Sequence, residues 1–187
     1  TLWHTLSLHD ALPISDQKRI GYGTGQPDLN FGLNLGGTYK GFSLDILLHG
    51  GSMFSGYISG LAQRPYDNES TPLNIHWEER FHEENNPDGN FPSVTMGRRG
   101  NNTKNSDFWL RSITFLRLKN VNLGYSLPKE WVNPIGVDRV RAYITSNNLY
   151  VISNLGIWSS EFDPESPLNH SAYPQHRTIT FGLTITL

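Results

Sequence analysis

A strict alternation of apolar and polar residues is the feature that most limits what this chain of 187 residues can fold into. In residues 31–39, Phe31, Leu33 and Leu35 occupy odd positions, and glycine, asparagine and threonine lie between them. Successive side chains of a β-strand point to opposite faces of its sheet, so a period of two predicts a strand with one apolar face. The same alternation returns in the final residues, which end at Leu187.

The whole pattern predicts an all-β fold of antiparallel, up-and-down strands. Between the first two strands, Lys40-Gly41 is a tight turn in which glycine can take a positive φ. In the third strand the apolar phase slips near Lys119-Asn120, which predicts a β-bulge there. About five strands are predicted, over residues 30–39, 42–51, 108–127, 138–151 and 176–187.

Composition excludes several classes of protein. With 12% aromatic and only 17% charged residues, the chain does not resemble a disordered polymer. Fifteen basic against seventeen acidic residues argue against a nucleic-acid-binding surface. The absence of cysteine excludes a disulfide scaffold and thiolate metal sites. No apolar run approaches the roughly twenty residues that a membrane-spanning helix needs.

The connections between the predicted strands differ greatly in length. Residues 40–41 and 128–137 are short connections, whereas residues 52–107 and 152–175 form two long loops. Short turns at one end and long loops at the other are typical of outer-membrane β-barrels. The alternation alone does not say whether the apolar face meets lipid or a protein core, so a soluble β-sandwich stays open on pattern alone. Five strands cannot close a barrel, so the membrane interpretation implies a piece of a larger protein.

The opening residues 1–15 look foreign to this pattern. The chain begins with Thr1 rather than Met, and residues 7–15, SLHDALPIS, resemble translated sequencing-adapter read-through. The alternative is a real loop or a short amphipathic helix. We therefore predict that residues 1–15 are an artefact outside the fold, and that residues 16–187 form the β-barrel segment.

Several ordered motifs resemble one family. Residues 115–128, FLRLKNVNLGYSLP, are similar to a signature near the C-terminus of SusC/RagA-type TonB-dependent outer-membrane transporters. At the family's spacing they are followed by VRAYITSNNL (residues 140–149), by EFDPE (residues 161–165), which resembles the family's acidic loop, and by RTITFGL (residues 177–183).

This resemblance implies the C-terminal part of a 22-stranded transmembrane β-barrel in a bacterial, Bacteroidetes-like outer membrane. It also implies an internal plug driven by the TonB complex, with the TonB box, the plug and most strands before residue 1, and a SusD-like surface lipoprotein as partner. Family members usually end in an aromatic residue, whereas this chain ends in Leu187.

We therefore expect a segment of an importer of glycans, oligosaccharides or peptides, in contact with outer-membrane lipid. No enzyme activity, catalytic residue, cofactor, metal site or nucleic-acid partner is expected. Two alternatives remain: a soluble all-β carbohydrate-binding module and a surface adhesin.

Candidate binding residues are few. Trp158, Glu161 and Asp163 in the second long loop are the predicted substrate or partner contacts, because aromatic rings stack on sugars and the acidic residues lie beside this ring. Trp109, near the outer end of a strand, is predicted to belong to an interfacial aromatic girdle.

Two further groups contain polar or charged side chains. Arg139, Arg141, Tyr143 and Asp45 would form part of a polar interior wall if they face the lumen. His76, Glu79 and Glu83 would lie close together on a helix and could ligate a metal, but without the HExxH spacing the charged face of a loop helix is the ordinary interpretation.

Overall fold

The structure is a computed structural model that describes residues 25–66, 71–94, 101–166, 168, 173 and 175–187. The stretch 1–15, predicted to be an artefact, lies outside the described residues. The chain divides into two compact units. We call the described residues of Pro27–Met53, Ile113–Asn154 and Pro174–Leu187 the sheet unit, and those of Phe54–Ser112 and Leu155–Tyr173 the loop unit.

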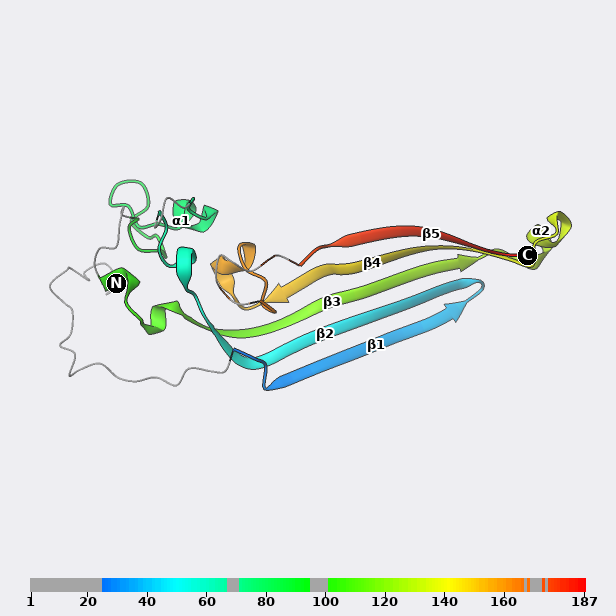
Figure 1. The fold of residues 1–187 in the computed structure, drawn as a ribbon, viewed down its shortest axis with the longest axis horizontal. Helices are drawn as coiled ribbons and strands as arrows, with labels where there is room; N and C mark the ends of the chain where they lie inside the picture. The colour runs from blue at the N-terminus through cyan, green and yellow to red at the C-terminus, as the bar shows by residue number, and fades with distance from the viewer. Residues whose placement is uncertain (1–24, 67–70, 95–100, 167, 169–172, 174) are drawn as a thin grey trace. The chain divides into compact units, whose positions relative to one another are not determined.

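Five antiparallel strands form one sheet in which the order of the strands follows the order of the sequence (Figure 1). This confirms the predicted all-β, up-and-down fold. The strands are β1 (Leu29–Tyr39), β2 (Phe42–Tyr57), β3 (Leu110–Ser126), β4 (Arg139–Ser153) and β5 (Thr178–Thr186).

A two-residue turn joins β1 to β2. Lys40 and Gly41 have φ angles of 46° and 88°, so both central residues are left-handed, as a type I′ turn requires. This turn pairs Tyr39 with Phe42 and sets the register of the hairpin up to the pair Leu29 and Ser52. The predicted tight turn is therefore confirmed.

The register between β3 and β4 shifts between Leu118 and Asn120, where the sequence predicted a bulge. Leu118 lies opposite Tyr150 and Asn120 lies opposite Asn147, so the extra residue belongs to β4. Asn148 has a φ of 51°, a left-handed conformation that asparagine tolerates better than most residues.

One face of the sheet is apolar along all five strands. The register aligns Leu123 of β3, Ile144 of β4 and Phe181 of β5 in one row across the strands. Many large apolar side chains of this face are between 41% and 79% exposed, among them Leu33, Leu35, Phe42, Leu44, Leu123, Phe181, Leu183 and Ile185. Within the sheet unit they form an exposed hydrophobic surface.

The loop unit has a hydrophobic core of its own. Short helices interrupt its two long segments: η2 (Gly60–Ala62), α1 (Asn74–Glu78), η4 (Asn101–Thr103), η5 (Asp107–Trp109) and η7 (Gly156–Ser160). Backbone hydrogen bonds from Ile58 N to Trp109 O (2.8 Å) and from Ser59 N to Leu168 O (3.1 Å) tie the segments together. The core consists of side chains that are at most 7% exposed, including Ile58, Ala62, Ile75, Phe91, Trp109, Leu155, Trp158 and Phe162.

Some boundaries differ from the predicted ones. β2 continues through Tyr57, six residues beyond its predicted end at 51, past the glycine pair Gly50-Gly51. The stretch from His76 to Glu84, predicted to be helical, contains only the last residues of α1 and then turns, with isolated bridges at Arg80 and His82. The connection after β3 contains α2 (Lys129–Val132) and η6 (Asn133–Ile135). Among the described residues, no helix has the length and apolarity needed to cross a bilayer.

Candidate functional site

The polar face of the sheet is crossed by hydrogen bonds between side chains of neighbouring strands. Asn120 Nδ2 donates to Asn147 Oδ1 over 2.8 Å, and Asn147 Nδ2 donates to Thr178 Oγ1 over 3.3 Å. One row of side chains thus links β3, β4 and β5. The remaining donors and acceptors of such a row can bind water or polar ligands.

Arg141 lies across two strands on this face. Its Nη2 donates to Ser43 Oγ on β2 over 3.0 Å, although β3 separates β2 from β4. The guanidinium reaches β2 by passing over Gly124 of β3, where an added Cβ would lie 2.5–2.8 Å from the guanidinium atoms. Glycine at this position therefore makes room for the arginine.

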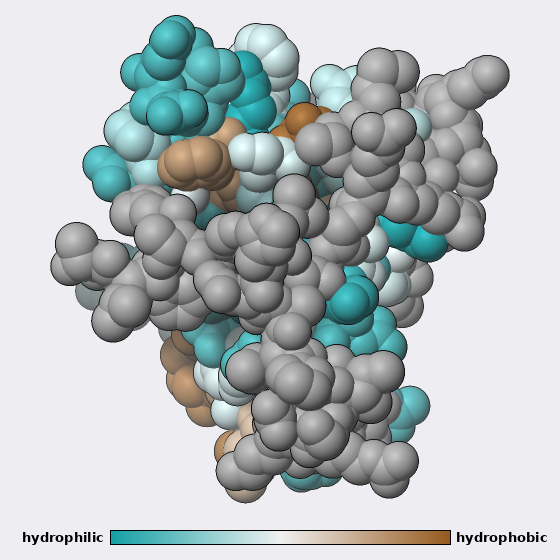
Figure 2. Space-filling model, turned by 90° about the vertical axis from the view of Figure 1, so that its left-hand side faces the viewer, coloured by the Kyte–Doolittle hydropathy of each residue, from teal (hydrophilic) through white to brown (hydrophobic). Residues whose placement is uncertain are grey.

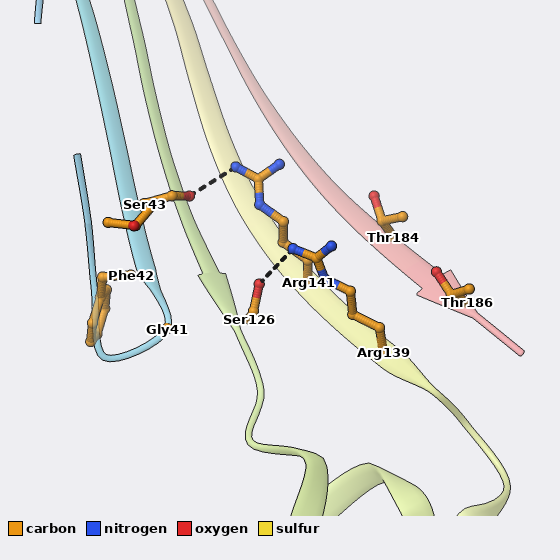
Figure 3. A pocket seen from close by; sticks show the side chains of 9 residues that line it. Gly41, Phe42, Ser43, Ser126, Arg139, Arg141, Thr184 and Thr186 are labelled. Carbon is orange, nitrogen blue, oxygen red and sulfur yellow. Dashed lines mark hydrogen bonds between the residues drawn. The ribbon is translucent and has the colours of Figure 1, made fainter. Parts of the chain in front are cut away.

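A hollow of about 450 Å³ opens on the polar face beside the β1–β2 turn (Figure 3). Arg139 Nη2 donates to Ser126 Oγ over 3.3 Å, so both arginines of the hollow have a serine hydroxyl as partner. Thr184 and Thr186 of β5 line its other side. Arg139, Arg141 and Tyr143, predicted for one polar wall, alternate along β4 and lie on the same face as Ser43 and Asp45.

The predicted contact residue Trp158 lies inside the core of the loop unit. Its side chain is 1% exposed, and its ring stacks on Phe162 with centroids 5.8 Å apart. Phe91 and Trp109 contact it edge to face, at 5.9 Å and 6.4 Å. A ligand therefore cannot stack on this indole while the core is closed. Trp109 is also 1% exposed, so the predicted girdle position is wrong for it.

Glu161 and Asp163 are half-buried residues that follow this indole. The Glu161 amide donates to the Trp158 carbonyl over 3.1 Å. Asp163 Oδ1 accepts the Glu165 amide hydrogen over 2.9 Å, and the Asp163 carbonyl accepts from Ser166 N. Asp163 thus stabilises the turn that follows it, while both residues keep part of their surface open. A role in ligand contact stays a prediction for them.

No family model matches the chain, but the chain is similar to several known proteins. TonB-dependent receptor P3 of Formosa agariphila is 26% identical over 207 residues, which covers 98% of this chain and 18% of that protein. TonB-dependent receptor SusC of Bacteroides thetaiotaomicron is 28% identical over 162 residues, which covers 86% of this chain and 15% of that protein.

Solved structures of the RagAB peptide transporter are similar in fold. One matches with a TM-score of 0.63 and 20% identity over 87% of this chain and 17% of that chain. The RagAB peptide importer in its closed-closed state matches with a TM-score of 0.64 and 21% identity. The chain is thus similar in sequence to TonB-dependent receptors, SusC among them, and similar in fold to the RagAB transporter. It spans less than a fifth of the length of these relatives.

Trp77, an aromatic residue that could stack on a sugar or lie in an interfacial girdle, is exposed in the structure. Trp77 at the end of α1 is 66% exposed, and the Arg80 guanidinium lies 3.7 Å from its ring centroid. Arg80 Nη1 also donates to the Trp77 carbonyl over 2.7 Å, which holds the pair together. Hydrophilic residues predominate on the coloured part of the face drawn in Figure 2.

His76, at the start of the acidic stretch, packs inside the loop unit. His76 is buried, its Nε2 lies 2.7 Å from the Ala62 carbonyl, and its Nδ1 accepts the Leu73 amide hydrogen over 3.0 Å. Both ring nitrogens are therefore engaged in holding α1. Within the part of the chain that the structure describes, no three His, Asp or Glu side chains are grouped to hold a metal ion.

Proposed function

We propose that this chain forms part of the wall of an outer-membrane β-barrel importer of the TonB-dependent type. In this assignment the apolar face of the sheet contacts lipid, and the polar face lines the interior. The two long connections, which leave the same end of the sheet, face the cell exterior. In this proposal the remaining strands of a 22-stranded barrel, and its internal plug, come from other parts of a longer protein.

The observation that carries this proposal is the exposed apolar face. Phe181 and Leu183 are 79% and 62% exposed, and similar side chains follow on every strand. A soluble monomer rarely exposes a continuous apolar surface of this kind, whereas lipid-facing strands require it. The strands are 9 to 17 residues long, and a tilted strand needs about 9–11 residues to cross a bilayer.

The loop unit is the proposed place of contact with partner and cargo. The similarity in fold to the RagAB peptide transporter supports a peptide cargo, and the motifs that resemble SusC/RagA-type transporters imply a SusD-like surface lipoprotein and an oligosaccharide as the alternative cargo. Transport consists of binding and gated passage, with energy from the TonB complex through the plug. No covalent step is assigned to any residue of this chain.

A detergent-free preparation of residues 16–187 tests the membrane assignment. We expect this polypeptide to aggregate in water, because its apolar face and the outer edges of β1 and β5 would be exposed. The measurement is size-exclusion chromatography followed by thermal unfolding. A monomer that melts cooperatively without detergent would instead favour a soluble carbohydrate-binding module.

Two equally exposed tryptophans test the role of the long loops. Trp77 in the first long connection and Trp131 in the short connection after β3 are each 66% exposed. In the full-length transporter we expect Trp77→Ala to weaken binding of the lipoprotein or cargo by about tenfold or more, the range of interface tryptophans. Trp131→Ala should leave binding unchanged. Equal losses in calorimetric titrations of both variants would contradict the proposed orientation.

A further inference from the structure

The hollow beside the β1–β2 turn contains two guanidinium groups and no acid. Arg139 and Arg141 each use one side-chain N–H donor on a serine hydroxyl, at 3.3 Å and 3.0 Å. A guanidinium has five such donors and stays protonated in proteins. Within the described ranges, no carboxylate pairs with either group, and each guanidinium donates one side-chain hydrogen bond, to a serine.

Two positive charges side by side are costly in a closed interior. If the polar face lines a barrel, as proposed above, the hollow loses much of its bulk water once the interior is filled. An arginine cannot escape this cost by losing its proton, so it needs an anionic partner. Asp45, the acid of β2 on this face, lies opposite Gly36 of β1, and its carboxylate occupies the space that a side chain at Gly36 would need.

The geometry of the hollow suits a carboxylate. The Arg141 guanidinium lies flat over Gly124, with Ser43 Oγ holding one end of it. A planar fork fixed in this way can bind both oxygens of a carboxylate, and the second arginine adds further charge-assisted hydrogen bonds. The hydroxyls of Thr184 and Thr186 line the opposite side and can donate to the same anion (Figure 3).

We propose that this hollow is a binding site for an Asp or Glu carboxylate of the same polypeptide, from a segment outside residues 1–187. The inference rests on the proposed function, because it requires the polar face to be interior. A protein segment is the occupant that the observations favour, since these residues make up only 15–18% of the length of the curated relatives SusC and P3. The ion pair would fasten that segment to the wall beside the short turns.

Zero-length cross-linking tests the site in the full-length transporter in outer membranes. Arg141→Lys keeps the charge and introduces an amine that a carbodiimide can join to a carboxylate in direct contact. Mass spectrometry should then show an amide between this position and an Asp or Glu outside the chain described here. Thr145→Lys, on the same face of β4 but outside the hollow, is the matched control, with a yield lower by about tenfold or more because coupling depends on proximity.

A charge exchange provides the second measurement. Arg141→Glu should weaken the attachment of the cross-linked segment, and replacing its carboxylate with lysine in the same molecule should restore it. Two results with the protein alone would overturn the inference: no cross-link in a correctly inserted, transport-competent Arg141→Lys variant, or equal cross-linking of Thr145→Lys. Biotin, added as a free carboxylic acid, provides a third result. Coupling of the amine introduced by Arg141→Lys only to biotin would show that no carboxylate of the protein lies beside it. A variant that never reaches the outer membrane would instead count against the proposed function, and inserted protein in the same samples separates the two cases.

Discussion

Ile144→Arg is expected to destabilise the full-length barrel in lipid by about 2–4 kcal/mol, the cost of an arginine on the lipid face near the middle of a bilayer. Ile144 lies near the centre of β4, in one row with Leu123 and Phe181. The new charge would lie among apolar side chains that the proposed orientation turns toward hydrocarbon. Unfolding in denaturant from lipid vesicles gives the free energy, and the amount of inserted protein in cells gives an independent readout.

The neighbouring substitution Thr145→Arg is the control for this result. Thr145 lies one residue further along β4 and therefore on the opposite face, where its hydroxyl bonds to Asn122 Oδ1. We expect a change within about 0.5 kcal/mol, as for an ordinary surface substitution. Arg141→Leu should likewise leave insertion intact. If both arginine variants are equally damaging, the assignment of the two faces is wrong.

Trp158→Ala is expected to open the loop unit, with a loss of about 3–5 kcal/mol of its local stability. The indole is 1% exposed and contacts three other rings, so its removal leaves a large cavity in the core that joins the two segments. Limited proteolysis of the transporter from outside the cell should show faster cleavage within residues 54–112. Hydrogen exchange of the same amides measures the free energy of opening.

Trp77→Ala is the comparison for this second result, because Trp77 belongs to the same unit and is 66% exposed. Its removal should leave the rate of proteolysis within about twofold of the unchanged protein, since surface substitutions usually change stability by at most 0.5 kcal/mol. Weaker cargo binding by Trp158→Ala without faster proteolysis would mean that this indole contacts ligand directly. The structure would then not represent the binding state.

The strands were predictable because their side chains obey a period of two. Alternation in residues 31–39 and at the end of the chain indicated β1 and β5, and Lys40-Gly41 indicated the hairpin turn. The phase slip at Lys119-Asn120 correctly indicated the register shift, although the extra residue lies on β4, near Asn148. These features are local, and local patterns are visible in a single sequence.

The loop unit could not be predicted in the same way. Phe91, Trp109 and Trp158 meet through contacts that join distant segments, and no periodicity records such contacts. An isolated tryptophan in a loop has the same sequence signature whether it is buried or exposed, which is why Trp158 and Trp77 were not distinguished. The hollow around Arg139 and Arg141 also depends on the pairing of four strands, although their shared face follows from their spacing.

The core of the loop unit is built from two separate connections, and this affects the order in which the chain folds. Phe91 and Trp109 precede β3, whereas Trp158 follows β4, so the ring contacts at the centre of the core join segments that are distant in sequence. Contacts between distant segments require loop closure first and therefore form slowly. These rings should become ordered only after β3 and β4, which lie between them in the sequence, have paired. The time at which the loop unit becomes resistant to protease would then report when the β3–β4 hairpin has formed.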